Sequence, residues 1–89
     1  MPTGNDSINR DFVLFHLREA SEELTRTIRE IETDSEYGIG EFGVTMMHLY
    51  HHINSAWNAR QVPPDRAFRS SDEDFAVWRR FPSDIDMSA

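Results

Sequence analysis

The amino-acid sequence predicts an all-α fold: a long antiparallel helical hairpin plus a short C-terminal helix, which dimerisation completes to a helical bundle. Three observations support this prediction. Apolar residues recur at helical spacing over residues 8–33, a broad apolar stripe covers residues 41–60, and a segment containing two glycines lies between them. No segment alternates polar and apolar residues as a half-buried strand would. Residues 1–89 are therefore expected to form a single helical domain.

The first helix is expected over residues 8–33, behind a flexible N-terminus of residues 1–7 and a cap at Ser7 or Asn9. Its apolar positions alternate in steps of three and four, which is typical of a helix that presents one seam to a partner. The seam consists of Leu14, Leu17, Ser21, Leu24, Ile28 and Ile31. A row of alternating charge is expected to face solvent, namely Arg18, Glu22, Arg26 and Glu30.

Residues 34–40 are expected to reverse the chain, because Gly38 and Gly40 tolerate positive φ. The second helix then runs over residues 41–60, until Pro63 and Pro64 stop it. Its apolar arc is too broad for one neighbour to cover. The residues of this arc are Phe42, Met46, Met47, Leu49, Tyr50, Ile53, Ala56 and Trp57.

A short third helix is expected over residues 72–80, before an acidic tail over residues 82–89. Ser70 and Glu73 have the spacing of a capping box, and three acidic residues over 72–74 suit the start of a helix. Polar residues near the end of the second helix are expected to fasten the chain that follows Pro64, with the lining of a pocket as the alternative, since buried amides need partners. These residues are Asn54, Trp57, Asn58 and Arg60.

Composition excludes several classes of function. The net charge is -7, so non-specific binding to nucleic acid is disfavoured. All nine basic residues are arginine, which excludes lysine chemistry such as Schiff-base formation. No apolar run approaches the roughly 20 residues that span a bilayer, which predicts a cytoplasmic protein without membrane contact. The chain has no cysteine, so neither disulfides nor thiolate zinc sites can stabilise it. Association with another copy, or a metal site of histidine and carboxylate ligands, could stabilise this small domain instead.

Four aromatic residues are the expected interface of a homo-oligomer, either a dimer or a larger assembly. Phe12 and Phe15 lie off the main seam of the first helix, so the C-terminal segment or a partner subunit must cover them. Tyr50 and Trp57 are seven residues apart and so share one side of the second helix.

His48 and His52 stand one helical turn apart and could supply two nitrogen ligands to a divalent metal such as zinc. Glu22 or Glu23 is expected roughly opposite His52 across the hairpin, as a carboxylate ligand. No glutamate directly follows His48, so the pair is not the H-E-x-x-H signature. The alternative is that both are hydrogen-bonded at the edge of the core. His16 and His51 are each expected to be partly exposed.

The sequence contains no cysteine nucleophile, Gly-x-Ser-x-Gly turn, phosphate-binding loop or dinucleotide fingerprint, which favours a protein that is not an enzyme. We therefore predict a small acidic interaction or regulatory module that acts as a homo-oligomer, with a further protein partner also compatible with its charge. The alternative is a helical protein that binds a divalent metal through histidine and carboxylate and could support hydrolysis.

Overall fold

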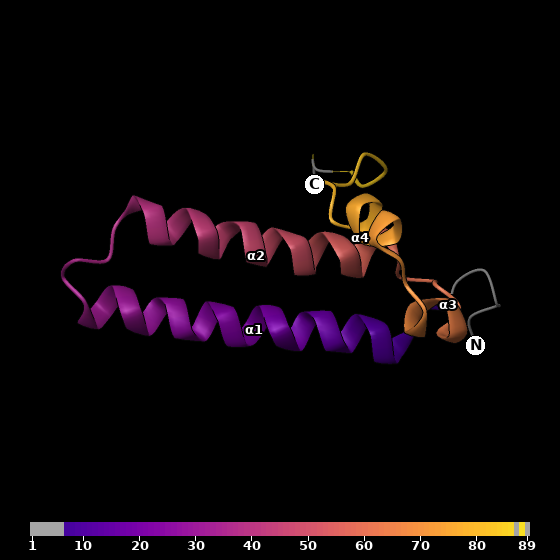
Figure 1. Cartoon of the computed structure of the whole chain (residues 1–89), viewed down its shortest axis with the longest axis horizontal. Helices are drawn as coiled ribbons and strands as arrows, with labels where there is room; N and C mark the ends of the chain where they lie inside the picture. Colours follow the sequence, from indigo (N-terminus) through magenta and orange to yellow (C-terminus); the bar gives the residue numbers. More distant parts are fainter. Residues whose placement is uncertain (1–6, 87, 89) are drawn as a thin grey trace.

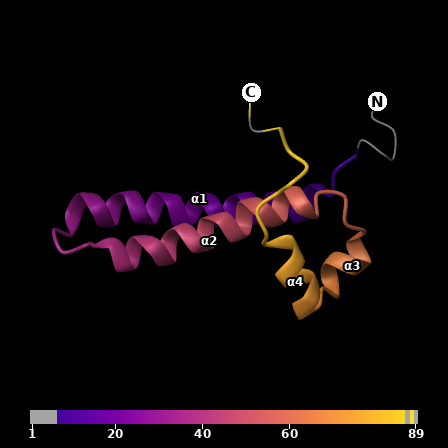
Figure 2. The ribbon, with the colours of Figure 1, turned by 90° about the horizontal axis from the view of Figure 1, so that it is seen from above.

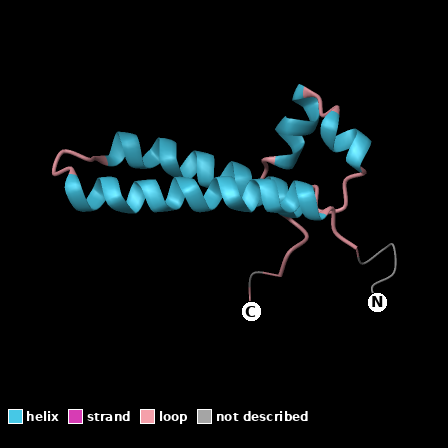
Figure 3. Ribbon diagram, turned by 90° about the horizontal axis from the view of Figure 1, so that it is seen from below, coloured by secondary structure: helices cyan, strands magenta, loops and turns pink. Residues whose placement is uncertain are grey.

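The computed structural model describes residues 7–86 and residue 88, and within this part the chain is all-helical without strands, as predicted. Helices α1 (Arg10–Thr33) and α2 (Ile39–Asn58) form a long antiparallel hairpin. Two short helices, α3 (Pro64–Phe68) and α4 (Asp72–Trp78), follow at the open end of the hairpin (Figure 1). Figures 2 and 3 show α3 and α4 on one side of the hairpin and the C-terminal tail leaving from the other.

The helix ends differ from the expected positions for local reasons. α1 begins at Arg10 rather than at residue 8, because the side chain of Asn9 accepts a hydrogen bond from the Phe12 N–H and so caps the helix. α2 takes in Ile39 and Gly40, which were expected in the loop, and ends at Asn58 rather than at residue 60. Of the expected flexible N-terminus, residues 1–6 lie outside the described residues.

The reversal between α1 and α2 depends on Asp34 rather than on the glycines. No described residue has positive φ, so the expected role of Gly38 and Gly40 was wrong. The Asp34 carboxylate accepts the Glu36 N–H at 2.9 Å, and its carbonyl accepts the Tyr37 N–H at 3.1 Å. An aspartate side chain that bonds the backbone two residues ahead forms a tight turn without glycine.

Small and polar side chains form most of the contact between α1 and α2. The buried apolar residues of the hairpin are Ala20, Leu49 and Ala56. Beside them the Thr27 hydroxyl lies 3.4 Å from that of Thr45, which the Tyr37 hydroxyl also approaches at 3.1 Å. The radius of gyration is 15.3 Å, against about 12 Å for a compact chain of this length. This elongated shape leaves the hairpin with very little apolar core of its own.

Helix α3 was not predicted, because Pro63 and Pro64 were read only as the end of the preceding helix. Pro64 occupies the first turn of α3, where a missing N–H costs nothing. The cap of α4 also lies one position later than expected. Ser71 and Asp74 form the capping box, and the Arg66 guanidinium of α3 donates to both carboxylate oxygens of Asp74, at 3.1 and 2.6 Å. These hydrogen bonds, above all those from Arg66, lower the pKa of Asp74 to about 2.

The polar end of α2 fastens the C-terminal segment, as predicted. The Asn54 amide donates to the Arg79 carbonyl at 3.0 Å, and the Asn58 amide donates to two carbonyls, of Trp78 at 2.8 Å and of Arg80 at 2.6 Å. The Trp57 indole N–H donates to the Asp84 carboxylate at 2.9 Å. Side-chain donors therefore satisfy carbonyls at the end of α4 that the helix leaves unpaired.

Asn9 joins the two ends of the hairpin. Besides capping α1, its side-chain amide donates to the Val62 carbonyl at 2.9 Å, and its backbone N–H donates to the Arg60 carbonyl at 2.6 Å. We expect Asn9→Ala to lower the free energy of unfolding by about 1–2 kcal/mol, because both side-chain bonds are lost. Asn9→Asp keeps the capping oxygen but not the donor, so its free energy of unfolding in urea denaturation should lie between those of the native chain and of Asn9→Ala. Equal stability of the Ala variant and the native chain would contradict this role.

No helix among the described residues is long and apolar enough to cross a membrane.

Candidate functional sites: a histidine cluster and an apolar hairpin face

Three histidines from both long helices meet near the open end of the hairpin. Nδ1 of His16 in α1 lies 3.0 Å from Nδ1 of His52 in α2, and His51 stands beside them, with its ring centroid 4.6 Å from that of His52. One ring nitrogen from each of the three lies within 4.8 Å of the others. His16 is buried, contrary to expectation, and His51 and His52 are half-buried.

His16 and His51 are held in their neutral forms at neutral pH. Burial, followed by charge repulsion from His52 and His51, lowers the pKa of His16 to about 4. The pKa of His51 is also lowered, first by burial and then by His52, Arg79 and His48. Since neutral imidazole carries an unprotonated ring nitrogen, the cluster presents acceptor atoms at neutral pH. The 3.0 Å contact between His16 and His52 then requires one nitrogen to donate a proton to the other.

Aromatic side chains surround the cluster. Phe12 contacts the His16 ring edge-on at 4.7 Å between centroids, and Phe75 of α4 lies 4.4 Å from the His51 ring. Together with α3 and α4, these residues line an open cavity of about 620 Å³, into which all three histidines project. The aromatic part of the lining is Phe12, Phe15, Phe68, Phe75 and Trp78. The histidines are therefore the polar floor of a largely apolar cavity.

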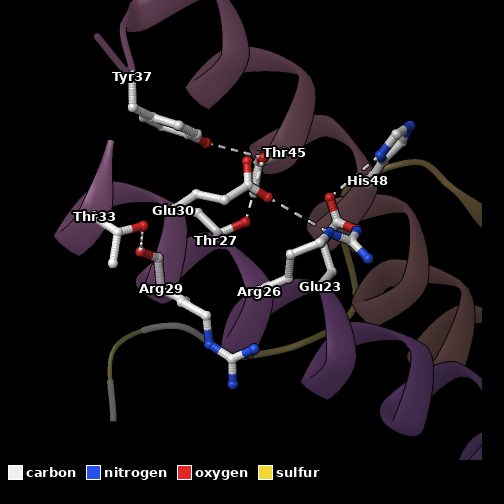
Figure 4. Close-up of polar contacts among 9 residues, drawn as sticks. All are labelled: Glu23, Arg26, Thr27, Arg29, Glu30, Thr33, Tyr37, Thr45 and His48. Atoms are coloured by element: carbon white, nitrogen blue, oxygen red, sulfur yellow. Dashed lines mark hydrogen bonds and ion pairs between the residues drawn. The ribbon is translucent and has the colours of Figure 1, made fainter. Parts of the chain in front are cut away.

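The four residues predicted to bind metal do not gather at one point. Figure 4 shows His48 directed at Glu23, with His48 Nδ1 3.4 Å from the carboxylate oxygen. His48 is half exposed, and Glu23 also pairs with Arg26. His52 turns instead toward His16, and Glu22 is exposed. The helical spacing of His48 and His52 correctly gave two histidines facing α1, but the register across the hairpin was wrong.

The length of the turn explains this difference in register. Because α2 begins at Ile39 and only residues 34–38 connect the helices, Thr27 lies opposite Thr45 and His16 opposite His52. The Glu23 carboxylate therefore meets α2 one turn earlier, at His48. The cluster could have been found by pairing His16 with His52 across an antiparallel hairpin. That pairing can be derived only when the length of the turn is known, and the periodicity of the helices does not give this length.

The seam of α1 is exposed along its whole length. Its apolar residues are 41–51% exposed, and two residues of α2, Phe42 and Ile53, are 42% and 49% exposed. We call these residues the apolar face: Leu14, Leu17, Leu24, Ile28, Ile31, Phe42 and Ile53. The predicted seam therefore exists, but α2 does not cover it.

Both parts of the apolar face lie on the same side of the hairpin. At 100° per residue, the seam of α1 is rotated by about a quarter turn from the Ala20 and Thr27 positions that face α2. Phe42 and Ile53 are rotated in the same sense from Thr45 and Leu49. Because the helices are antiparallel, the same rotation in the direction of increasing residue number brings the α1 seam and the pair Phe42 and Ile53 to one side of the hairpin. The histidines, α3 and α4 occupy the other side. The C-terminal tail leaves from the side of the apolar face at the open end, and no further described element lies near the turn half of the hairpin (Figures 1 and 2).

The four predicted interface residues do not make up the apolar face. By the same rotation, Phe12 and Phe15 lie on the other side of the hairpin, and Tyr50 and Trp57 lie beside the edge of the apolar face on α2. Phe12 and Trp57 contact the C-terminal segment of the same chain, through Trp78 at 5.6 Å between ring centroids and through Asp84 respectively. Phe15 and Tyr50 are 55% and 47% exposed, but neither belongs to the apolar face, although Tyr50 contacts Phe81. The intramolecular cover for Phe12 is thus one of the two arrangements that the sequence left open.

Comparison of this chain with models of known protein families, with curated proteins and with solved structures found no match.

Proposed function

We propose that this protein is a small acidic interaction module that acts as a homodimer, in which two hairpins pair through their apolar faces to form a helical bundle. The observation that supports the proposal is the exposure of the α1 seam, at 41–51% for every leucine and isoleucine in it. Exposed apolar patches larger than a few hundred Å² are characteristic of interaction surfaces. A spacing of three and four over the length of α1 suits packing against another helix.

The size of the face suits a second hairpin. A helix of 24 residues is about 36 Å long. Two helices, each about 10 Å in diameter and with axes about 9 Å apart, together present a side on the order of 600 Å². Stable interfaces bury about 800 Å² of accessible surface per partner, so the face is of the right order. A self-complementary, uncharged face is what a two-fold symmetric dimer requires.

The charge of the chain favours a protein surface over a lipid surface as the occupant. Amphipathic helices that lie on membranes carry lysine and arginine on their polar face, whereas this chain has a net charge of -7 and no lysine. Two such copies repel each other at long range, so their association must come from the apolar face. We therefore expect added salt to strengthen the dimer, whereas an interface held by ion pairs would weaken.

Ile28→Glu tests the proposal, because it places a charge in the middle of the apolar face of both copies. The dissociation constant of the dimer should rise by at least about 100-fold, as expected for a buried unpaired charge. Sedimentation equilibrium over a range of protein concentrations measures it. Val44→Glu is the matched control, since Val44 is 52% exposed, against 51% for Ile28, but lies on the opposite side of the hairpin.

A native chain that remains monomeric at high micromolar concentration would overturn the proposal. An equal loss of association in both glutamate variants would place the contact elsewhere.

A further inference from the structure

The histidine cluster goes beyond an interaction module, since one chain holds it complete without a partner copy. We propose that His16, His51 and His52 together bind one divalent transition-metal ion, with zinc as the best match. The three ring nitrogens already lie within 4.8 Å of one another and come from the two helices of the hairpin.

The distances suit coordination after small side-chain movements. In a tetrahedral zinc site with metal–nitrogen bonds of about 2.0–2.1 Å, the ligand nitrogens are roughly 3.3 Å apart. His16 Nδ1 and His52 Nδ1, at 3.0 Å, are already close to this separation. A rotation of the half-buried His51 ring can bring its nitrogen into range. His51 Nδ1 also lies 3.5 Å from the Ser55 hydroxyl, which can orient the ring as outer partners of metal-bound histidines do.

The donor set selects the class of metal. Three imidazoles without carboxylate or thiolate suit zinc, copper, nickel or cobalt, and they disfavour magnesium and calcium, which require oxygen ligands. Three protein ligands leave the fourth position of a tetrahedral ion for water or another small ligand. That position would face the aromatic cavity lined by Phe12, Phe75 and Trp78.

The contacts within the cluster leave its ring nitrogens available to a cation. Without a metal, three imidazoles packed together gain only one hydrogen bond between them, of His16 with His52. The net charge of -7 also raises the local concentration of cations around the chain.

The test is a titration of metal-free chain with zinc by calorimetry, and with cobalt by visible absorption, which reports tetrahedral coordination directly. We expect one equivalent per chain, and at least about 100-fold weaker binding for His16→Gln and for His52→Gln, because even outer partners of ligands contribute 10–100-fold. Circular dichroism of the same variants distinguishes loss of a ligand from loss of the fold. His48→Gln is the matched control, since His48 belongs to the same helix but contacts Glu23.

Several outcomes would overturn the site. These are the absence of stoichiometric zinc binding, unchanged binding in folded His16→Gln, or an octahedral cobalt spectrum in the native chain. Loss of binding in His48→Gln and Glu23→Gln, but not in His16→Gln, would instead identify the histidine and carboxylate set. Repeating the titration with Ile28→Glu separates this site from dimerisation, because a monomer should still bind one equivalent.

Discussion

Lowering the pH from about 7 to about 4.5 should destabilise the metal-free protein by roughly 2–3 kcal/mol through His16 alone. The pKa of this histidine falls from 6.5 to about 4 on folding, so the unfolded chain binds more protons than the folded chain throughout that interval. Its stabilising effect is therefore complete above pH 6.5 and is lost as the pH falls toward 4. The lowered pKa of His51 acts in the same direction.

Carboxylates contribute in a different interval. The pKa of Asp74 is lowered to about 2, and that of Asp84 is lowered mainly by its bond from Trp57, so their contributions disappear only as the pH falls through their folded pKa values. A loss of stability above pH 4.5 can thus be assigned to the histidines.

Urea denaturation at a series of pH values, in the presence of a chelator, measures the effect. His16→Gln should flatten the profile between about pH 6.5 and pH 4.5, because no buried imidazole is then left at this position to protonate. His48→Gln should retain most of the slope, since His48 is half exposed and is the smallest of the causes that lower the pKa of His51. A native profile that is flat in this interval would contradict the assignment.

Leu49→Ala should lower the free energy of unfolding by about 2–4 kcal/mol, which is a large share of the stability of a small domain. Leu49 is 8% exposed, and the other buried apolar residues among those described are Ala20, Ala56, Ala59 and Val62. Removing the largest buried apolar side chain of the hairpin leaves a cavity between α1 and α2 that their small neighbours cannot fill.

Met47→Ala is the matched control, because Met47 lies two positions away on α2 and is 60% exposed. Both variants should be compared at one fixed protein concentration, since dimerisation would make the apparent stability depend on it. If the two variants lose similar stability, Leu49 does not anchor the hairpin.

Much of the fold follows from local patterns. The α1 seam, the apolar arc of α2 and the polar residues from Asn54 to Arg60 correctly predicted two long helices and a fastened C-terminal segment. The helix predicted over residues 72–80 is α4, and it begins at Asp72 as expected, although its cap is Ser71 rather than Ser70. Helix ends depend on single hydrogen bonds. The sequence offered Ser7 and Asn9 as caps of the first helix, and the structure selects Asn9, whose side chain accepts the Phe12 N–H.

The candidate site could not be derived in the same way. His16 and His52 are 36 positions apart, and their contact depends on the five-residue turn and on the rotation of each helix about its axis. The pattern of α1 shows one apolar seam, yet it cannot show that Ala20 and Thr27, rather than the leucines, face α2. His48 and His52 do lie one helical turn apart on the side of α2 that faces α1. Their partners, Glu23 and His16, are set by the register of α1 against α2.

The amino-acid sequence by itself determined two amphipathic helices joined by a short turn, since helix formation depends on residues three and four positions apart. Only the tertiary structure decided which side of each helix faces the other, because packing of small side chains at the helix contact competes with burial of the larger ones. That choice left the apolar face uncovered and brought His16, His51 and His52 together, so both proposals depend on the rotation of α1 against α2.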